Sequence, residues 1–172
     1  MKVRCGFVSN SSSTSHIIMW KGKKEDLRGL LEKHARKFAL KCRSCAALGF
    51  TCNSTPEETI DLICSCLDGT YLDSPLCIPT AERIEMFEAE LKWLRKDMES
   101  ADDIVMRSLR EYEAKVLHCV SVAGRMDWSI IVAFGDNHGY LHGRGLPCLL
   151  DYAGRNIRIS SPELEYMTDQ DR

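Results

Sequence analysis

The sequence lacks any hydrophobic run that approaches the ~20 residues a helix needs to cross a membrane. Near the N-terminus, the polar residues from Asn10 to Ser15 interrupt the apolar stretch that a secretory signal requires. No internal repeat or low-complexity tract occurs beyond the N-terminal serines. These absences argue against a membrane-spanning or secreted protein, and they predict a cytoplasmic protein that makes no membrane contact.

A complete catalytic motif is also missing. A phosphate-binding loop of the GxxxxGK[ST] type needs glycines and a lysine, but no glycine lies between Gly6 and Gly22. The segment 135–139, GDNHG, resembles the first metal-binding motif of metallophosphoesterases, yet the later motifs of that family, of the GDxxDR and GNHE kind, do not follow it. Asp-Asn is a natural turn dipeptide, so we interpret this segment as a hairpin turn and predict no catalytic residue.

What the chain does have is the composition of an ordinary globular domain. It contains 172 residues, of which 44% are hydrophobic and 28% charged. The pattern of segments predicts a single α+β domain over residues 1–172, with an N-terminal strand and Ser-rich loop in 1–20, a helical part in 21–123 and a C-terminal β part in 124–172.

The net charge of −2 conceals a strong asymmetry along the chain. Residues 1–49 hold 11 Lys and Arg against 3 Asp and Glu, whereas the remaining residues hold 12 against 22. A split of this kind is typical of a basic face that binds nucleic acid or an acidic protein. It is equally consistent with two parts of one chain that pack against each other, and both interpretations stay open.

Three helices are expected in the middle of the chain. A basic amphipathic helix begins at Leu27 and ends near Gly49, and a second begins at Pro56, with Thr55 as its N-cap. The third is the longest, because apolar residues spaced by three and four continue from Thr80 to about Val116. The alternative is that the segment 100–103 is a cap at which a second helix starts. The continuous spacing favours one long helix.

Strands are expected at both ends of the chain. Apolar residues precede and follow the Ser-rich run, and residues 116–122 and 128–134 are apolar segments of strand length. A second hairpin is expected from 149–152 and 157–159, followed at Ser161 by a final helical turn and a polar tail. We expect the N-terminal strand to pair with C-terminal strands in a small antiparallel sheet, with the three central helices covering one face.

The residues at the N-terminus carry a second resemblance. Residues 6–10, GFVSN, and the Ser/Thr run after them resemble the opening of phage and bacterial proteins of unknown function that begin with GFVSNSSSSSF. The chain departs from that pattern at Thr14 and at His16, where an aromatic residue is usual. The resemblance implies a phage-type accessory protein that acts in the cytoplasm of a bacterial host. Ser and Asn in such a run favour a turn with side-chain-to-backbone hydrogen bonds.

Nine cysteines give a candidate metal site. Cys42 and Cys45 form a CxxC pair, and Cys64 and Cys66 follow with CxC spacing, so these four are the candidate zinc ligands. Cys42 and Cys45 also fall on the apolar stripe of the first helix, and Cys64 lies beside Ile60 and Ile63 on the second. At such positions cysteine behaves as a small hydrophobic residue. We predict that the protein needs no cofactor, with zinc as the alternative.

The candidate function is the binding of a host macromolecule, most naturally a protein, in host takeover or counter-defence. The candidate binding residues lie in the Ser-rich loop and on the basic helix: Asn10, Ser11, Ser12, Ser13, Arg28, Lys33, Arg36, Lys37, Lys41 and Arg43. The alternative is a zinc-stabilised module that binds nucleic acid through the same helix. A homodimer through the long helix is a further possibility. An enzyme that uses the serines with His16 is a third hypothesis.

Overall fold

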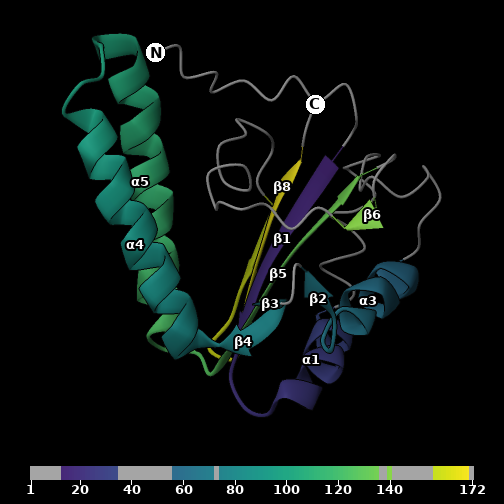
Figure 1. Ribbon diagram of the computed structural model, residues 1–172. Helices are drawn as coiled ribbons and strands as arrows, with labels where there is room; N and C mark the ends of the chain where they lie inside the picture. The colour runs from purple at the N-terminus through teal and green to yellow at the C-terminus, as the bar shows by residue number, and fades with distance from the viewer. Residues whose placement is uncertain (1–12, 35–55, 72–73, 136–138, 141–156, 171–172) are drawn as a thin grey trace.

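The computed structural model describes residues 13–34, 56–71, 74–135, 139–140 and 157–170 (Figure 1). Its helices are the 3₁₀ helix η1 (Lys24–Asp26) and the α-helices α1 (Leu27–Lys33), α3 (Pro56–Ser65), α4 (Thr80–Met98) and α5 (Asp103–Ala123). Its strands are β1 (Ser13–Trp20), β2 (Thr70–Tyr71), β3 (Ser74–Pro75), β4 (Cys77–Pro79), β5 (Trp128–Gly135), β6 (Gly139–Tyr140), β7 (Ile157–Ser160) and β8 (Leu164–Gln170).

The central feature is an antiparallel sheet with the strand order β4-β5-β1-β8-β7, in which β6 also pairs with β5. Strand β1 lies between β5 and β8, so that Ile17 stands opposite Ile131 on one side and Met167 on the other. The N-terminal strand therefore pairs with C-terminal strands, and the predicted α+β class is confirmed. The buried strand expected at residues 128–134 is confirmed as β5.

Helices cover both faces of this sheet. Because successive residues of a strand point to opposite faces, the apolar run at the end of β1 supplies two cores at once. Ile18 and Trp20 are buried with residues of α1 and α3, whereas Ile17 and Met19 are buried with residues of α4 and α5. Figure 1 shows these helix pairs on opposite sides of the sheet. The expectation that the helices cover only one face was wrong.

The long central helix is in fact two helices. The first, α4, ends at Met98, and the second, α5, starts at Asp103. The carboxylate of Asp102 caps α5 by accepting a hydrogen bond from the backbone N–H of Val105 at 2.9 Å. The break folds the apolar seam back on itself, so that Phe87 and Leu94 of α4 share a buried cluster with Val116 of α5. The seam from which a homodimer was predicted is therefore occupied within the chain.

Removing this cap should weaken the hairpin. We expect Asp102→Ala to lower the free energy of unfolding by about 1 kcal/mol, because an N-terminal backbone donor of α5 loses its acceptor. Urea denaturation of the variant measures this effect. Glu111→Ala, an exposed change within the same helix, is the control and should leave stability nearly unchanged. Equal stability of the Asp102 variant and the native chain would show that the cap contributes nothing.

Three other local predictions were wrong. Residues 116–122 form the end of α5 and not a strand, and residues 13–15 are extended in β1 and not part of a turn. Residues Leu164–Gln170 form the strand β8 and not a polar tail, because Ser161 makes a tight turn in which its backbone N–H donates to the carbonyl of Leu164 at 2.8 Å. The predicted strand at 149–152 and the basic helix beyond residue 34 lie outside the described residues.

Candidate protein-binding surface

Two of the predicted basic binding residues are paired with acidic residues of the same chain. Arg28 lies 2.7 Å from Asp61 of α3, and Lys33 lies 2.8 Å from Glu163 in the turn before β8. The hydrogen bond with Asp61 raises the pKa of Arg28, and the hydrogen bond from Lys33 lowers the pKa of Glu163. These exposed pairs contribute little to stability, but they support the interpretation that the basic N-terminal part packs against the acidic remainder.

Of the remaining predicted binding residues, Ser13 alone lies within the described ranges. Ser13 is the first residue of β1 and pairs with Gly135 of β5. The others lie outside the described residues: Asn10, Ser11, Ser12, Arg36, Lys37, Lys41 and Arg43. The same holds for two of the four candidate zinc ligands, Cys42 and Cys45.

The cysteines that the structure does describe have the character of core residues. Cys64, Cys66, Cys77 and Cys119 are reduced thiols. Burial raises the pKa of Cys64, and it raises that of Cys77 to about 11. A thiol must lose its proton to bind zinc, so burial opposes metal binding at these positions. Within the described part of the chain, no three His, Cys, Asp or Glu side chains are grouped closely enough to hold a metal ion.

His16 is a core residue and not an accessible base. Its side chain is fully buried, and its Nδ1 lies 2.8 Å from the hydroxyl oxygen of Tyr166 on the neighbouring strand. Burial lowers the pKa of His16 to about 3, so the imidazole is neutral at physiological pH. A side chain enclosed in this way cannot reach a substrate together with the serines before it.

A second buried polar group, Glu165, lies in the core on the other face of the sheet from His16. The buried carboxylate of Glu165 accepts a hydrogen bond from the hydroxyl of Ser160 at 2.6 Å, and its other oxygen lies 3.4 Å from Nε2 of His118 on α5. The carboxylate stands between the hydroxyl and the imidazole, whereas a catalytic triad needs the imidazole in the middle. These contacts give each oxygen of the buried carboxylate a hydrogen-bonding partner inside the core.

The most prominent surface feature is the hairpin made by α4 and α5. Among the side chains that the structure describes, every large hydrophobic one that is markedly exposed belongs to this hairpin: Met86 at 45%, Trp93 at 49%, Val105 at 47% and Leu117 at 44%. The other described large apolar side chains are buried or half-buried. Single exposed apolar side chains are common on protein surfaces, so these four point to an interaction site only where they adjoin a groove or another apolar side chain.

Between the two helices lies a groove of about 480 Å³. Leu117, Leu91 and Val120 make its apolar lining, and the charged side chains at its rim are those of Glu88, Lys92 and Arg95. Arg95 is 2.8 Å from Glu113 of α5, an ion pair that joins the two helices beside the groove. The groove thus has an apolar lining and charges of both signs around it.

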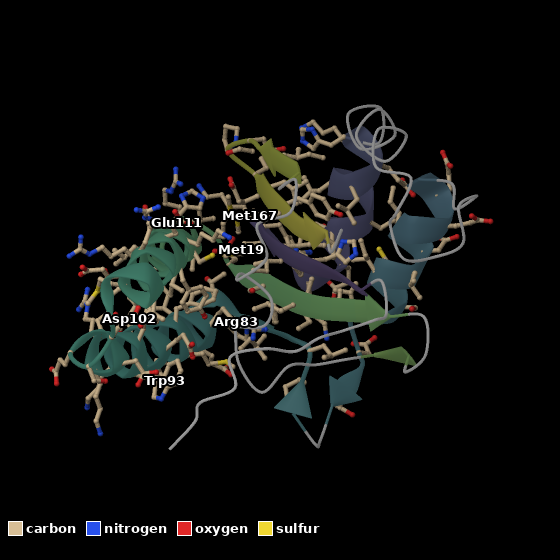
Figure 2. The ribbon with its side chains drawn as sticks, turned by 90° about the horizontal axis from the view of Figure 1, so that it is seen from above. Met19, Arg83, Trp93, Asp102, Glu111 and Met167 are labelled. Atoms are coloured by element: carbon tan, nitrogen blue, oxygen red, sulfur yellow. The ribbon has the colours of Figure 1, made fainter. Side chains whose placement is uncertain are left out.

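Arg83 attaches the base of the hairpin to the sheet. Its buried guanidinium donates hydrogen bonds to the carbonyl of Leu76 at 3.0 Å and to the hydroxyl of Ser129 at 3.2 Å. Figure 2 places Arg83 where α4 meets the sheet, and Met19 and Met167 on the sheet face nearest the hairpin. Burial lowers the pKa of Arg83 to about 10, so the group stays charged at neutral pH.

Arg83 also fixes a surface residue, because its Nη1 lies 3.6 Å from the sulfur of Met86. Sequence reasoning missed this surface, since it followed the apolar stripe that became the core. Met86 and Trp93 lie off that stripe and are seven residues apart, which puts them on one face of α4. That spacing of two apolar residues among charged ones was the available signal.

Comparisons with known families, proteins and structures identify no relative from which a function could be transferred. No helix in the described ranges has the length and apolar character needed to span a membrane. No protein-family model matches the chain, and no curated protein and no solved structure matches it.

Proposed function

We propose that the protein is a non-catalytic, phage-type accessory protein that binds a host protein through the α4–α5 hairpin. The observation that carries the proposal is the groove between the helices, with the half-exposed Leu117 in its lining. Because 44% of Leu117 is exposed, burying this exposed part against a partner is favourable by about 1 kcal/mol. The partner that fits is an amphipathic helix, which lays its apolar face into a groove of this kind.

The host as source of the partner follows from the N-terminal resemblance, and the choice of a protein follows from the hairpin. The ion pairs of Arg28 and Lys33 within the chain reduce the charge available for phosphate groups. A groove with an apolar lining favours a protein over a nucleic acid, whose binding depends mainly on clustered cations. We therefore place the binding surface on the hairpin and not on α1.

The test compares two substitutions on the same helix. We expect Leu117→Glu to reduce the amount of partner captured from bacterial lysate at least tenfold, because a charge enters the apolar lining of the groove. Val105→Glu is the matched control, since Val105 is equally exposed on α5 but does not line the groove. Quantitative mass spectrometry of the captured proteins gives the ratio for each variant.

Loss of the same protein from both variants would mean that the groove is not the binding site. Capture of no stoichiometric protein by the native chain would contradict the proposed function itself. Circular dichroism spectra and unfolding midpoints of both variants check that the hairpin stays folded, because both positions are half-exposed and should tolerate the change.

A further inference from the structure

The exposed face of α4 that carries Met86 and Trp93 indicates which kind of partner could make a second contact with the protein. The charged side chains that lie one helical turn from these two residues and reach solvent are mostly acidic: Glu82, Glu90 and Asp97, with Lys96 as the one cation among them. Figure 2 shows Trp93 on the side of α4 away from α5. This face is therefore distinct from the groove between the two helices.

The charges on this face are available to a partner. In the described part of the chain, Glu82, Asp97 and Lys96 take part in no ion pair shorter than 4 Å. Glu90 differs, because its carboxylate accepts a hydrogen bond from the hydroxyl of Tyr112 at 3.1 Å and burial raises its pKa. The charged groups that reach solvent around the two apolar side chains are thus three carboxylates and one ammonium group. The other cation one helical turn away, the guanidinium of Arg83, is buried and donates its hydrogen bonds to Leu76 and Ser129.

The two apolar side chains are also spaced and held in a defined way. Seven residues of an α-helix rise by roughly 10 Å, so Met86 and Trp93 are separated by about two turns. The exposed residue one turn from each of them is Ala89, whose methyl group adds no charge and little bulk between the two. The buried guanidinium of Arg83 contacts the sulfur of Met86 and keeps this residue at the base of the face. An exposed indole ring attracts cations over its face as well as apolar groups.

We propose that this face of α4 docks a basic amphipathic helix of the partner protein, with apolar side chains two turns apart on Met86 and Trp93 and with Lys or Arg side chains against the surrounding carboxylates. The proposal deepens the proposed function, and it depends on protein binding by the hairpin. The complementarity of charge sets the partner apart from an acidic or neutral helix.

Three synthetic peptides test the proposal directly. The first is an 18-residue helical peptide with leucine at every seventh position, lysine at the flanking positions and alanine elsewhere. The second replaces each lysine with glutamate, and the third replaces each leucine with alanine. We expect saturable binding of the lysine–leucine peptide, binding at least tenfold weaker for the lysine–alanine peptide, and none for the glutamate peptide, measured by fluorescence anisotropy.

Substitutions on the protein assign this binding to the face. We expect Trp93→Ala to weaken the lysine–leucine peptide at least tenfold, and Glu82→Lys at least fivefold, because Glu82 is an exposed carboxylate one turn from Met86. Glu111→Lys is the matched control, because Glu111 is an exposed carboxylate on α5, outside this face (Figure 2), and it should change affinity less than twofold. Unfolding midpoints of all three variants check that α4 and α5 stay folded.

The results separate the inference from the proposed function. Equal binding of all three peptides, or equal loss in Glu82→Lys and Glu111→Lys, would overturn the inference. The inference would also be overturned if Trp93→Ala captured its partner from lysate in full while Leu117→Glu captured none. That outcome would leave the proposed function intact. Loss of lysate capture in both Trp93→Ala and Leu117→Glu supports the inference.

Discussion

Replacing His16 with phenylalanine is expected to make the protein's loss of stability on acidification smaller by about 2 kcal/mol. The loss meant here is the fall in the free energy of unfolding between about pH 7.5 and about pH 5. Burial lowers the pKa of His16 from 6.5 to about 3 in the folded chain. Between these two values the unfolded chain binds a proton that the folded chain does not, so the free energy of unfolding falls as the pH falls. The stabilisation is complete above pH 6.5 and is lost progressively below it.

Urea denaturation at both pH values measures the difference for each variant. His16→Phe also removes the hydrogen bond to Tyr166, but that loss acts at both pH values and cancels in the comparison. Tyr166→Phe is the matched control, because it removes the same hydrogen bond and keeps the imidazole. An unchanged pH dependence in His16→Phe would show that His16 titrates in the folded chain as it does in the unfolded one.

Phe87→Ala is expected to lower the free energy of unfolding by about 3–5 kcal/mol. Phe87 is fully buried in the cluster that α4 and α5 share with Ile17 and Met19 of β1, so its removal leaves a cavity where the hairpin meets the sheet. An effect of this size requires that the hairpin and the sheet unfold together. The attachment bears on the proposed function, because the proposed binding surface lies on the hairpin.

The neighbouring substitution Met86→Ala is the control for Phe87→Ala. Met86 is half-exposed and its sulfur atom contacts Arg83, so we expect a change below about 1 kcal/mol. Thermal unfolding followed by circular dichroism compares both variants with the native chain. A loss of similar size in both would mean that α4 is not buried against the sheet through Phe87.

Strands with a clear apolar pattern were predictable from the sequence. The segment 128–134 is apolar at nearly every position, which is typical of a strand buried on both faces, and residues 129–132 of β5 are buried in that way. The run HIIMW at the end of β1 has the same property and lies in the middle of the sheet. The α+β class follows from these strands and the helical segments between them.

Two elements were missed because of a physical ambiguity. In β8 the sequence LEYM places Glu165 between two buried residues, and a glutamate normally indicates solvent, but Ser160 and His118 satisfy this one inside the core. The long apolar seam suits one continuous helix or an antiparallel pair equally well, because both arrangements bury the same stripe. Only the cap at Asp102 distinguishes the antiparallel pair from one continuous helix, and a cap is too short and too common a motif to decide between them.

The candidate site was harder to predict than the fold. Basic residues on an amphipathic helix suggest a binding face, yet Arg28 and Lys33 are paired with acids that lie far away in the sequence. Periodicity identifies the residues that become buried, and it says little about the exposed ones such as Leu117 and Trp93. The groove that Leu117 lines is formed only when the two helices lie side by side, so no spacing within one helix predicts it. For Trp93 the only signal in the sequence is its seven-residue separation from Met86.

A photo-crosslinking amino acid placed at Leu117, and at Val105 in a parallel sample, tests the central claim most directly in living bacterial cells. The groove predicts one dominant covalent adduct with a single host protein from position 117 and little or none of it from position 105, because Leu117 lines the groove and Val105 does not. No adduct from position 117, or the same set of adducts from both positions, would contradict binding at the hairpin groove.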